Sequence, residues 1–206
     1  LQRAGWKLRR LAVLPNGCVD VDDVDDALQS PTGIVSVMLV NNETGVIQDV
    51  AHVAQRARTA RAWMHTDAVQ ALGKIAIDFE ALGVHAMTLS AHKICGPKGV
   101  GALIFDRRID IEPLLRGGGH ERGLRSGTLN VPGIVGFGAA CELACTQIDD
   151  YQAKVGALRD ALESGLRALG ATIFGAAARR VANTSYFAFP GIQGRSEEHT
   201  SELQSH

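Results

Sequence analysis

The sequence has few cysteines and no long apolar segment. Its 206 residues include four cysteines, Cys18, Cys95, Cys141 and Cys145, which are too few and too scattered for a disulfide framework. No apolar stretch reaches the roughly 18 residues that cross a bilayer. The first ten residues, LQRAGWKLRR, lack the apolar core of a signal peptide. We therefore expect a cytoplasmic protein with reduced thiols and no membrane partner.

An excess of charge is also absent. The chain has 21 lysines and arginines against 22 acidic residues, a formal net charge of −1. Such a balance provides no long-range field for nucleic acid or an anionic membrane. We expect no nucleic-acid partner. By contrast, 46% of the residues are hydrophobic, which is enough for the core of one domain, or of one domain and part of a second.

Strand and helix patterns alternate through the first half of the chain. Residues 34–40 (IVSVMLV) form a β-branched run typical of a strand that is covered on both faces. Residues 49–60 carry apolar positions at helical spacing, which predicts an amphipathic crossover helix. Further strands are expected at 62–66, 86–90 and 99–105, with a helix or turn between the first two of these. This order predicts an α/β fold with a mainly parallel sheet.

The second half has a different organisation. Residues 106–128 are rich in glycine and lack periodicity, so we expect a long ordered loop or an excursion toward a partner. Helices are predicted at 131–148 and 151–169, and strands of a second unit at 172–174 and 185–189. We expect domains at 1–148 and 149–194. Residues 195–206 (RSEEHTSELQSH) resemble the translation of a sequencing adapter, and we expect a non-native tail there.

Lys93 is the first candidate for chemistry. It follows the strand predicted at 86–90, and ligands of open parallel sheets bind at the carboxyl ends of strands. A partly desolvated lysine there can form an imine with an aldehyde cofactor. Spacing alone favours an ordinary surface lysine, so neighbouring residues must decide between the two interpretations.

Asp67 supplies that context, because it ends the preceding strand and a crossover connection brings it to the same edge of the sheet. A buried carboxylate there can keep a pyridine nitrogen protonated, as pyridoxal phosphate enzymes require. The alternative is that Asp67 caps the following helix. Gln70 and Asn42 can reach the same edge and hydrogen-bond a phenolic oxygen of the ring.

Five motifs together identify a family. They are VNNETG at 40–45, HTDAVQ at 65–70, SAHK at 90–93, GPKG at 96–99 and GGGHERGLRSGT at 117–128. In order and spacing they resemble the cysteine desulfurases, which belong to the class V aminotransferase group of pyridoxal phosphate enzymes. The resemblance extends from about Gly5 to Gly194.

The resemblance implies a role for each candidate residue. Lys93 would be the Schiff-base lysine and the catalytic residue, and Asp67 the partner of the pyridine nitrogen. Asn42 and Gln70 would contact the ring oxygen of the cofactor, pyridoxal 5'-phosphate.

The phosphate of the cofactor would be held by a second set of residues. Ser90 and His92 would bind it within one chain, and Thr128 would reach the phosphate of a neighbouring subunit, which implies a homodimer. A glycine-rich backbone suits the approach to a phosphate, although a flexible surface loop is the alternative. The implied fold is the three-layer sandwich of an aspartate-aminotransferase-like large domain, followed by the start of a smaller α+β domain.

The resemblance also implies a reaction. L-cysteine would be converted to L-alanine, with its sulfur passed to an enzyme thiolate as a persulfide for a sulfur acceptor or an iron–sulfur scaffold protein. The family's nucleophilic cysteine loop, substrate-carboxylate arginine, phosphate loop and stacking histidine have no counterpart in this sequence. We therefore expect a chain truncated at both ends and inactive alone.

Four alternatives stay open. The chain could belong to another class V enzyme, such as a selenocysteine lyase or an aminotransferase, or be a non-catalytic fragment. Cys95 could replace the missing nucleophile, although a buried thiol at a strand-to-turn junction is the commoner case. Cys141 and Cys145 could share a metal ion, although packing in a helix core is favoured.

Overall fold

A four-stranded sheet forms the centre of the protein. The computed structural model describes residues 5–192. Its strands β1 (Ile34–Met38), β2 (Trp63–Asp67), β3 (Ala86–Ser90) and β4 (Gly101–Phe105) pair in this order. The first three are parallel, and β4 runs antiparallel to β3. The predicted mainly parallel sheet is confirmed.

Short helices connect the parallel strands. Helix α2 (Val50–Thr59) joins β1 to β2, α3 (Phe79–Leu82) precedes β3, and α1 (Val21–Ala27) precedes β1. The Asp49 carboxylate caps α2 by accepting a hydrogen bond from the His52 amide at 3.2 Å. One face of α2 is buried, which confirms the amphipathic crossover helix; its buried residues are Val50, Val53, Ala54 and Ala57.

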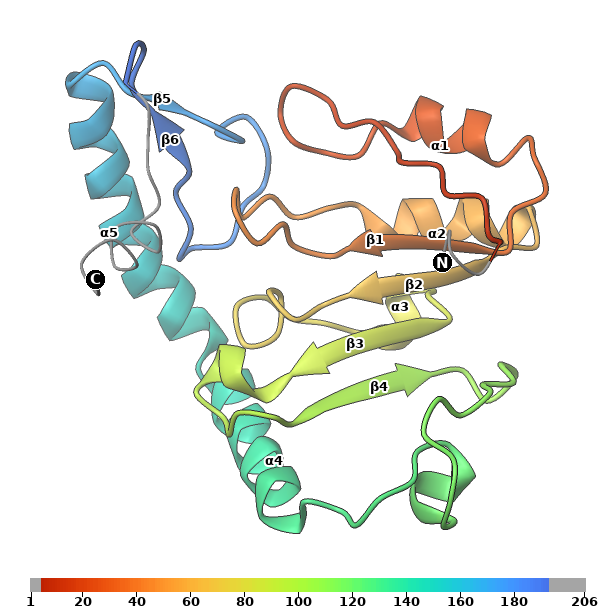
Figure 1. Cartoon of the computed structure of the whole chain (residues 1–206). Coiled ribbons are helices and arrows are strands. Elements are labelled where there is room, and N and C mark those ends of the chain that lie inside the picture. The colour runs from red at the N-terminus through yellow and green to blue at the C-terminus, as the bar shows by residue number, and fades with distance from the viewer. Residues whose placement is uncertain (1–4, 193–206) are drawn as a thin grey trace, which may run out of the picture.

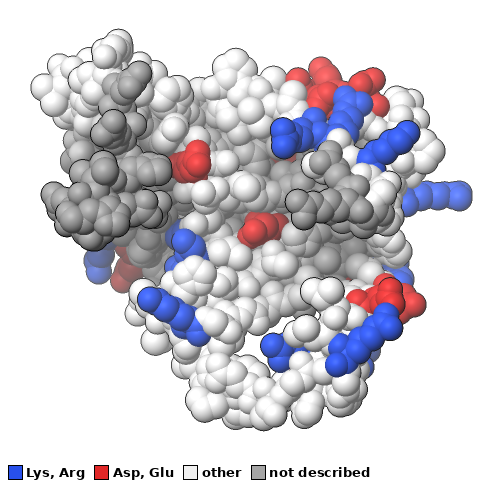
Figure 2. Space-filling model, in the orientation of Figure 1, with Lys and Arg blue, Asp and Glu red and all other residues white. Residues whose placement is uncertain are grey.

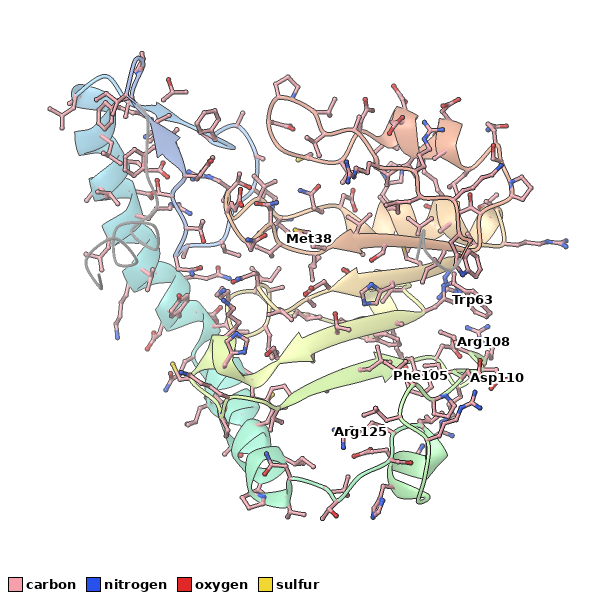
Figure 3. The ribbon with its side chains drawn as sticks, viewed as in Figure 1. Met38, Trp63, Phe105, Arg108, Asp110 and Arg125 are labelled. Carbon is pink, nitrogen blue, oxygen red and sulfur yellow. The ribbon has the colours of Figure 1, made fainter. Side chains whose placement is uncertain are left out.

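The two faces of the sheet differ in burial. Val35 and Met64 are buried on the side of α2. On the other side, Ile34, Met38 and Trp63 are 52%, 38% and 44% exposed, and Figure 3 shows Met38 and Trp63 at opposite ends of this open face. The expectation that 34–40 is a strand covered on both faces is therefore wrong for the described residues, because their helices cover only one side of β1.

The second half forms two long helices and a small sheet. Helices α4 (Val131–Thr146) and α5 (Ile148–Ala168) are followed by β5 (Thr172–Ile173) and β6 (Phe187–Ala188), which pair antiparallel. Both strands are shorter than predicted, and Gly175, at φ 68°, turns the chain away from β5. In Figure 1, α4 and α5 lie along the edge where β1, β2 and β3 end.

A buried ion pair fastens α5 to the segment before β6. Arg180 donates to both carboxylate oxygens of Glu163, at 2.8 and 2.9 Å, and Arg167 donates to one of them at 3.0 Å. The Glu163 side chain is 2% exposed and that of Arg180 is 7% exposed. The same segment meets the turn after β1, since the Val181 amide donates to the Gly45 carbonyl at 2.9 Å and the Ile47 amide to the Arg179 carbonyl at 2.8 Å.

His85 is buried in its neutral form. Its Nδ1 accepts a hydrogen bond from the Met64 amide at 2.9 Å, which requires that nitrogen to be unprotonated. Its ring meets the Trp63 ring edge to face, with centroids 4.9 Å apart. Burial lowers the pKa of His85, and the nearby Arg58 guanidinium lowers it further.

We expect the fold to lose stability in mild acid through His85. A histidine with a folded pKa below its ordinary value of about 6.5 contributes stability that is complete above that value and is lost as the pH falls through the lower folded pKa. Urea unfolding between pH 8 and pH 5.5 measures this loss. His85→Leu should be less stable at pH 8 by about 1–3 kcal/mol, because the Met64 amide loses its acceptor, and its stability should depend less on pH. Equal pH dependence in the two proteins would contradict the assignment.

Candidate functional site

All the candidate residues except Thr128 lie at or just beyond the edge of the sheet where the parallel strands end. Asn42 follows β1, Asp67 ends β2 and Ser90 ends β3. The first two strands remain joined here, because the Leu39 amide donates to the Asp67 carbonyl at 2.8 Å. The predicted convergence on one edge is thus found for the elements that carry these residues. This is the place where open parallel sheets bind ligands.

Lys93 lies in a 3-10 turn that directly continues β3, over residues Ala91–Ile94. Its side chain is exposed, whereas Ala91 is fully buried beneath the turn. Gly96 closes the turn by donating to the Ala91 carbonyl at 3.0 Å. A Cβ at position 96 would lie 2.9 Å from that carbonyl oxygen and 3.2 Å from the Ala140 Cβ, so glycine permits α4 to pack directly against the turn that presents Lys93.

Cys95 differs from the expectation of a buried thiol. It ends the 3-10 turn with a left-handed backbone, at φ 61°, and its side chain is exposed. The expectation is wrong because this capping position turns the side chain to the surface rather than into the core. Cys141 packs against the apolar cluster around Phe137, as expected for a core thiol, whereas Cys145 is exposed.

Asp67 is exposed, and the expectation of a buried carboxylate is wrong. It belongs to the open face of β2, where no described helix covers it. Its Oδ1 accepts a hydrogen bond from the Val69 amide at 2.9 Å, so Asp67 caps a turn; residues 69–74 do not form the helix that was expected to follow. Within residues 5–192 the second oxygen accepts no hydrogen bond from a side chain, which leaves it able to accept one from a ring nitrogen.

His65 lies two residues before Asp67 on the same face, and the sequence motifs did not predict its role. Its Nδ1 is 2.8 Å from the Ser36 hydroxyl and its Nε2 is 3.3 Å from the Thr88 hydroxyl. Burial lowers the pKa of His65, and the Asp67 carboxylate partly opposes this. The His65 ring thus joins a polar row across three strands, between the Ser36 and Thr88 hydroxyls. The sequence could have indicated that His65 shares a face with Asp67, because residues two apart in a strand point to the same side.

Ser90 and His92 form a hydrogen-bonded pair beside Lys93. The Ser90 hydroxyl is 2.7 Å from His92 Nδ1. A hydroxyl and an imidazole held together at the start of a turn can both bond to an oxyanion. The predicted grouping of these two residues with Lys93 is therefore seen, while their role as phosphate ligands stays a prediction.

Asn42 lies on a turn that its neighbour organises. The Asn41 side-chain oxygen accepts hydrogen bonds from the Glu43 and Thr44 amides at 3.0 and 2.8 Å, as in an Asx turn. The Asn42 side chain is exposed on this turn.

Gln70 is bonded to a residue outside the sequence motifs. The ammonium of Lys74 donates to Gln70 Oε1 at 2.6 Å, and the side chain of Lys74 is almost completely buried. Burial lowers the pKa of Lys74, and the positive charge of Lys93 lowers it further. The sequence did not predict this contact, because a separation of four residues brings side chains together in a helix and these residues lie in a turn.

Thr128 belongs to the long loop, which begins at the other edge of the sheet. The loop leaves β4 beside His85, where the Asp106 amide donates to the His85 carbonyl at 2.8 Å, and Figure 1 shows it projecting from that end. Figure 3 shows Arg108 and Asp110 near its start. Thr128 is exposed, and in the described part of the chain no hydrogen bond links it to Ser90 or His92.

A depression of about 290 Å³ adjoins this edge. Its lining is basic and includes Lys74, Arg159, Arg179 and Arg180. Two of the arginines pair with acidic neighbours, Arg159 with Asp160 and Arg180 with Glu163. On the face seen in Figure 2, acidic and basic side chains are interspersed among uncharged ones. For residues 5–192, no cluster of three histidine, cysteine or acidic side chains could hold a metal ion.

Taken singly, none of the described helices has the length and apolar character of a membrane span. Helices α4 and α5 meet such a criterion only as a pair, and they are bent by 69°.

Comparison with known proteins gives consistent matches. The aminotransferase class-V family profile matches residues 1–204. A relative from Colwellia psychrerythraea named cysteine desulfurase IscS is 44% identical over 199 residues, covering 95% of this chain and 49% of its own length. A cysteine desulfurase from Bradyrhizobium diazoefficiens is 44% identical over 200 residues, covering 97% and 51%.

Solved structures agree with the sequence matches. A NifS-like protein from Rickettsia africae superimposes with a TM-score of 0.85 at 35% identity, over 89% of this chain and 52% of its own. The chain thus spans about half the length of the curated relatives it matches.

Proposed function

Because the chain belongs to the aminotransferase class-V family, we propose that it forms part of a cysteine desulfurase, which converts L-cysteine to L-alanine and transfers the sulfur as an enzyme persulfide. The observation that carries the proposal is the single sheet edge at which Lys93, Asp67 and the Ser90–His92 pair are presented. The names of the relatives support the choice of reaction within the family.

The residues at this edge fit pyridoxal 5'-phosphate. Lys93 offers an amine, Asp67 a carboxylate oxygen for the ring nitrogen, and Asn42 and Gln70 offer amides for the ring oxygen. The Ser90–His92 pair offers the phosphate two side-chain ligands at the start of a turn. When bound, this cofactor supplies an electron sink for bonds at the substrate α-carbon.

The chain's own residues then divide the work. The exposed Lys93 amine moves the α-proton of the substrate, while the Asp67 carboxylate keeps a proton on the ring nitrogen. Thr128 contributes to the site of a second copy, so the working unit is a homodimer. The sulfur-accepting cysteine is outside this chain in the proposal, and Cys95 does not replace it.

The chain is proposed to contain one domain and the start of another, and to act with a sulfur acceptor. Residues 1–148 form the cofactor-binding domain and 149–194 begin a second domain; the adapter-like residues 195–206 lie outside the described part of the chain. The persulfide sulfur passes to an acceptor or iron–sulfur scaffold protein. The four free cysteines fit a reducing compartment such as the cytoplasm.

A hybrid enzyme tests the proposed function. Residues 5–192 replace the matching half of a full-length relative, and alanine and sulfide are measured after addition of L-cysteine with a thiol reductant. We expect equal amounts of both products. Release of alanine from selenocysteine alone would favour a selenocysteine lyase, and amino transfer to a keto acid would favour an aminotransferase. A folded hybrid that binds the cofactor and gives no sulfide overturns the proposal.

A further inference from the structure

We propose that Lys74 is a positioning residue that fixes the orientation of the Gln70 side-chain amide, so that Gln70 offers its N–H to an anionic ring oxygen of the cofactor. The inference rests on the proposed function, which it deepens by adding a residue that the motifs did not include.

The Lys74 ammonium is a buried charge without a nearby carboxylate in the described part of the chain. Its residue is only 6% exposed, and among residues 5–192 no carboxylate lies within ion-pair distance of it. A buried charge without an opposite charge is costly. Its side-chain hydrogen bond is the 2.6 Å contact with Gln70 Oε1. The buried ammonium therefore lowers the stability of the fold, and its hydrogen bond is directed at the Gln70 side-chain amide.

The contact between Lys74 and Gln70 can form in only one orientation of the amide. An ammonium group donates hydrogen bonds and cannot accept them. Gln70 must therefore turn its oxygen to Lys74 and its NH₂ group away. The flipped amide would place two donors against a positive charge in a buried place.

A Gln70 side chain that donates its N–H favours an ionised acceptor over a protonated one. An N–H stabilises an ionised oxygen and leaves a protonated hydroxyl without an acceptor. A charge-assisted hydrogen bond to Oε1 also polarises the amide and strengthens its N–H as a donor. The phenolic oxygen of the cofactor is the acceptor of matching chemistry, because Gln70 follows Asp67 by three residues at the same edge.

The backbone around Lys74 holds this arrangement in place. The Gln152 side chain, from α5, donates to the Lys74 carbonyl at 2.8 Å. The Lys74 amide itself donates to the Ala71 carbonyl at 3.0 Å. The backbone of Lys74 is thus fixed independently of its side chain, so a neutral side chain can replace the lysine without removing these contacts.

The hybrid enzyme tests the proposal with three variants: Lys74→Met, Lys74→Arg and Gln70→Leu. We expect Lys74→Met to fold with stability equal to or above that of the parent hybrid, because a buried charge is removed. The ionised ring form of its bound cofactor, followed by absorbance, should titrate at a pH shifted up by about one unit, which is about tenfold in the equilibrium. The kcat should fall about tenfold with little change in KM. Lys74→Arg should keep both the titration pH of the cofactor and the kcat close to those of the parent hybrid.

A double variant separates positioning from a direct electrostatic effect. If Lys74 acts through Gln70, Lys74→Met added to Gln70→Leu has no further effect on the spectrum or on kcat. Additive effects, or an unchanged cofactor spectrum in a folded Lys74→Met protein, overturn the proposal. These outcomes are distinct from failure of the proposed function, which the parent hybrid alone reports.

Discussion

Replacing Lys93 with alanine is expected to abolish desulfurase activity of the hybrid enzyme. In the proposed function, the Lys93 amine would hold the cofactor and would also move the α-proton of the substrate. Loss of proton transfer alone lowers kcat by about 10²–10⁴-fold, and loss of the imine adds to it. Alanine formation, followed at saturating L-cysteine, measures the effect.

Borohydride reduction gives a second measurement that does not depend on turnover. It should fix the cofactor to one peptide, the one that contains Lys93, and the label should disappear in Lys93→Ala. Lys154→Ala is the matched control, because Lys154 is an exposed lysine of α5 far along the chain from the turn after β3. A label that persists on another lysine in Lys93→Ala, or activity near that of the parent, would refute the assignment.

Replacing Glu163 with glutamine is expected to destabilise the fold severely. The substitution keeps the shape of the side chain but leaves the Arg180 guanidinium buried without its counter-charge. Breaking a buried ion pair on one side costs about 3–5 kcal/mol. Urea unfolding of the 206-residue chain at pH 7 measures the change. Arg167→Ala is the control, and it should cost less than about 1 kcal/mol, because Arg167 is 51% exposed.

The same pair predicts a dependence on acid. The hydrogen bonds from Arg180 hold the pKa of Glu163 below its ordinary value of 4.5. The stability that this shift provides is complete above that value and is lost as the pH falls through the lower folded pKa. Glu163→Gln should therefore lose less stability than the parent between pH 5 and pH 3. Parallel pH profiles for the two proteins would show that the carboxylate does not act in this way.

Local patterns were sufficient to predict most elements of the fold. Alternating β-branched runs and the apolar face of residues 49–60 predicted three parallel strands and their first crossover helix, because these patterns depend only on side-chain periodicity. The strand at 99–105 was also found, but its antiparallel direction was not predicted. The connection from Ser90 to Gly101 is shorter than the dozen or so residues that a parallel crossover needs.

Burial was harder to predict than strand position. A run such as IVSVMLV has the composition of a strand covered on both sides, yet only alternate residues of β1 are buried. The sequence of a strand does not contain the packing of distant elements against it. Asp67 was expected to be buried because a partner of a pyridine nitrogen is commonly a buried carboxylate, yet it lies on the open face.

The candidate site was predicted in its strand ends but not in its supporting contacts. Lys93 and Asp67 were recognisable because each follows or ends a strand pattern, whereas Ser90 was recognised only through the motif at 90–93. Lys74 and His65 were missed, because their importance depends on partners that the fold brings to them, Gln70 in one case and Ser36 with Thr88 in the other. Such pairings are properties of tertiary structure.

Two backbone hydrogen bonds join the turn after β1 to the segment before β6, and they report whether that segment is packed against the turn. The Ile47 and Val181 amides lie far apart in the sequence and are protected by each other's segments. Their hydrogen–deuterium exchange should therefore speed up together whenever α5 and its following segment detach, even while the central sheet stays protected. Because Asn42 lies on the same turn, this exchange rate would report how firmly the fold holds that side chain in place.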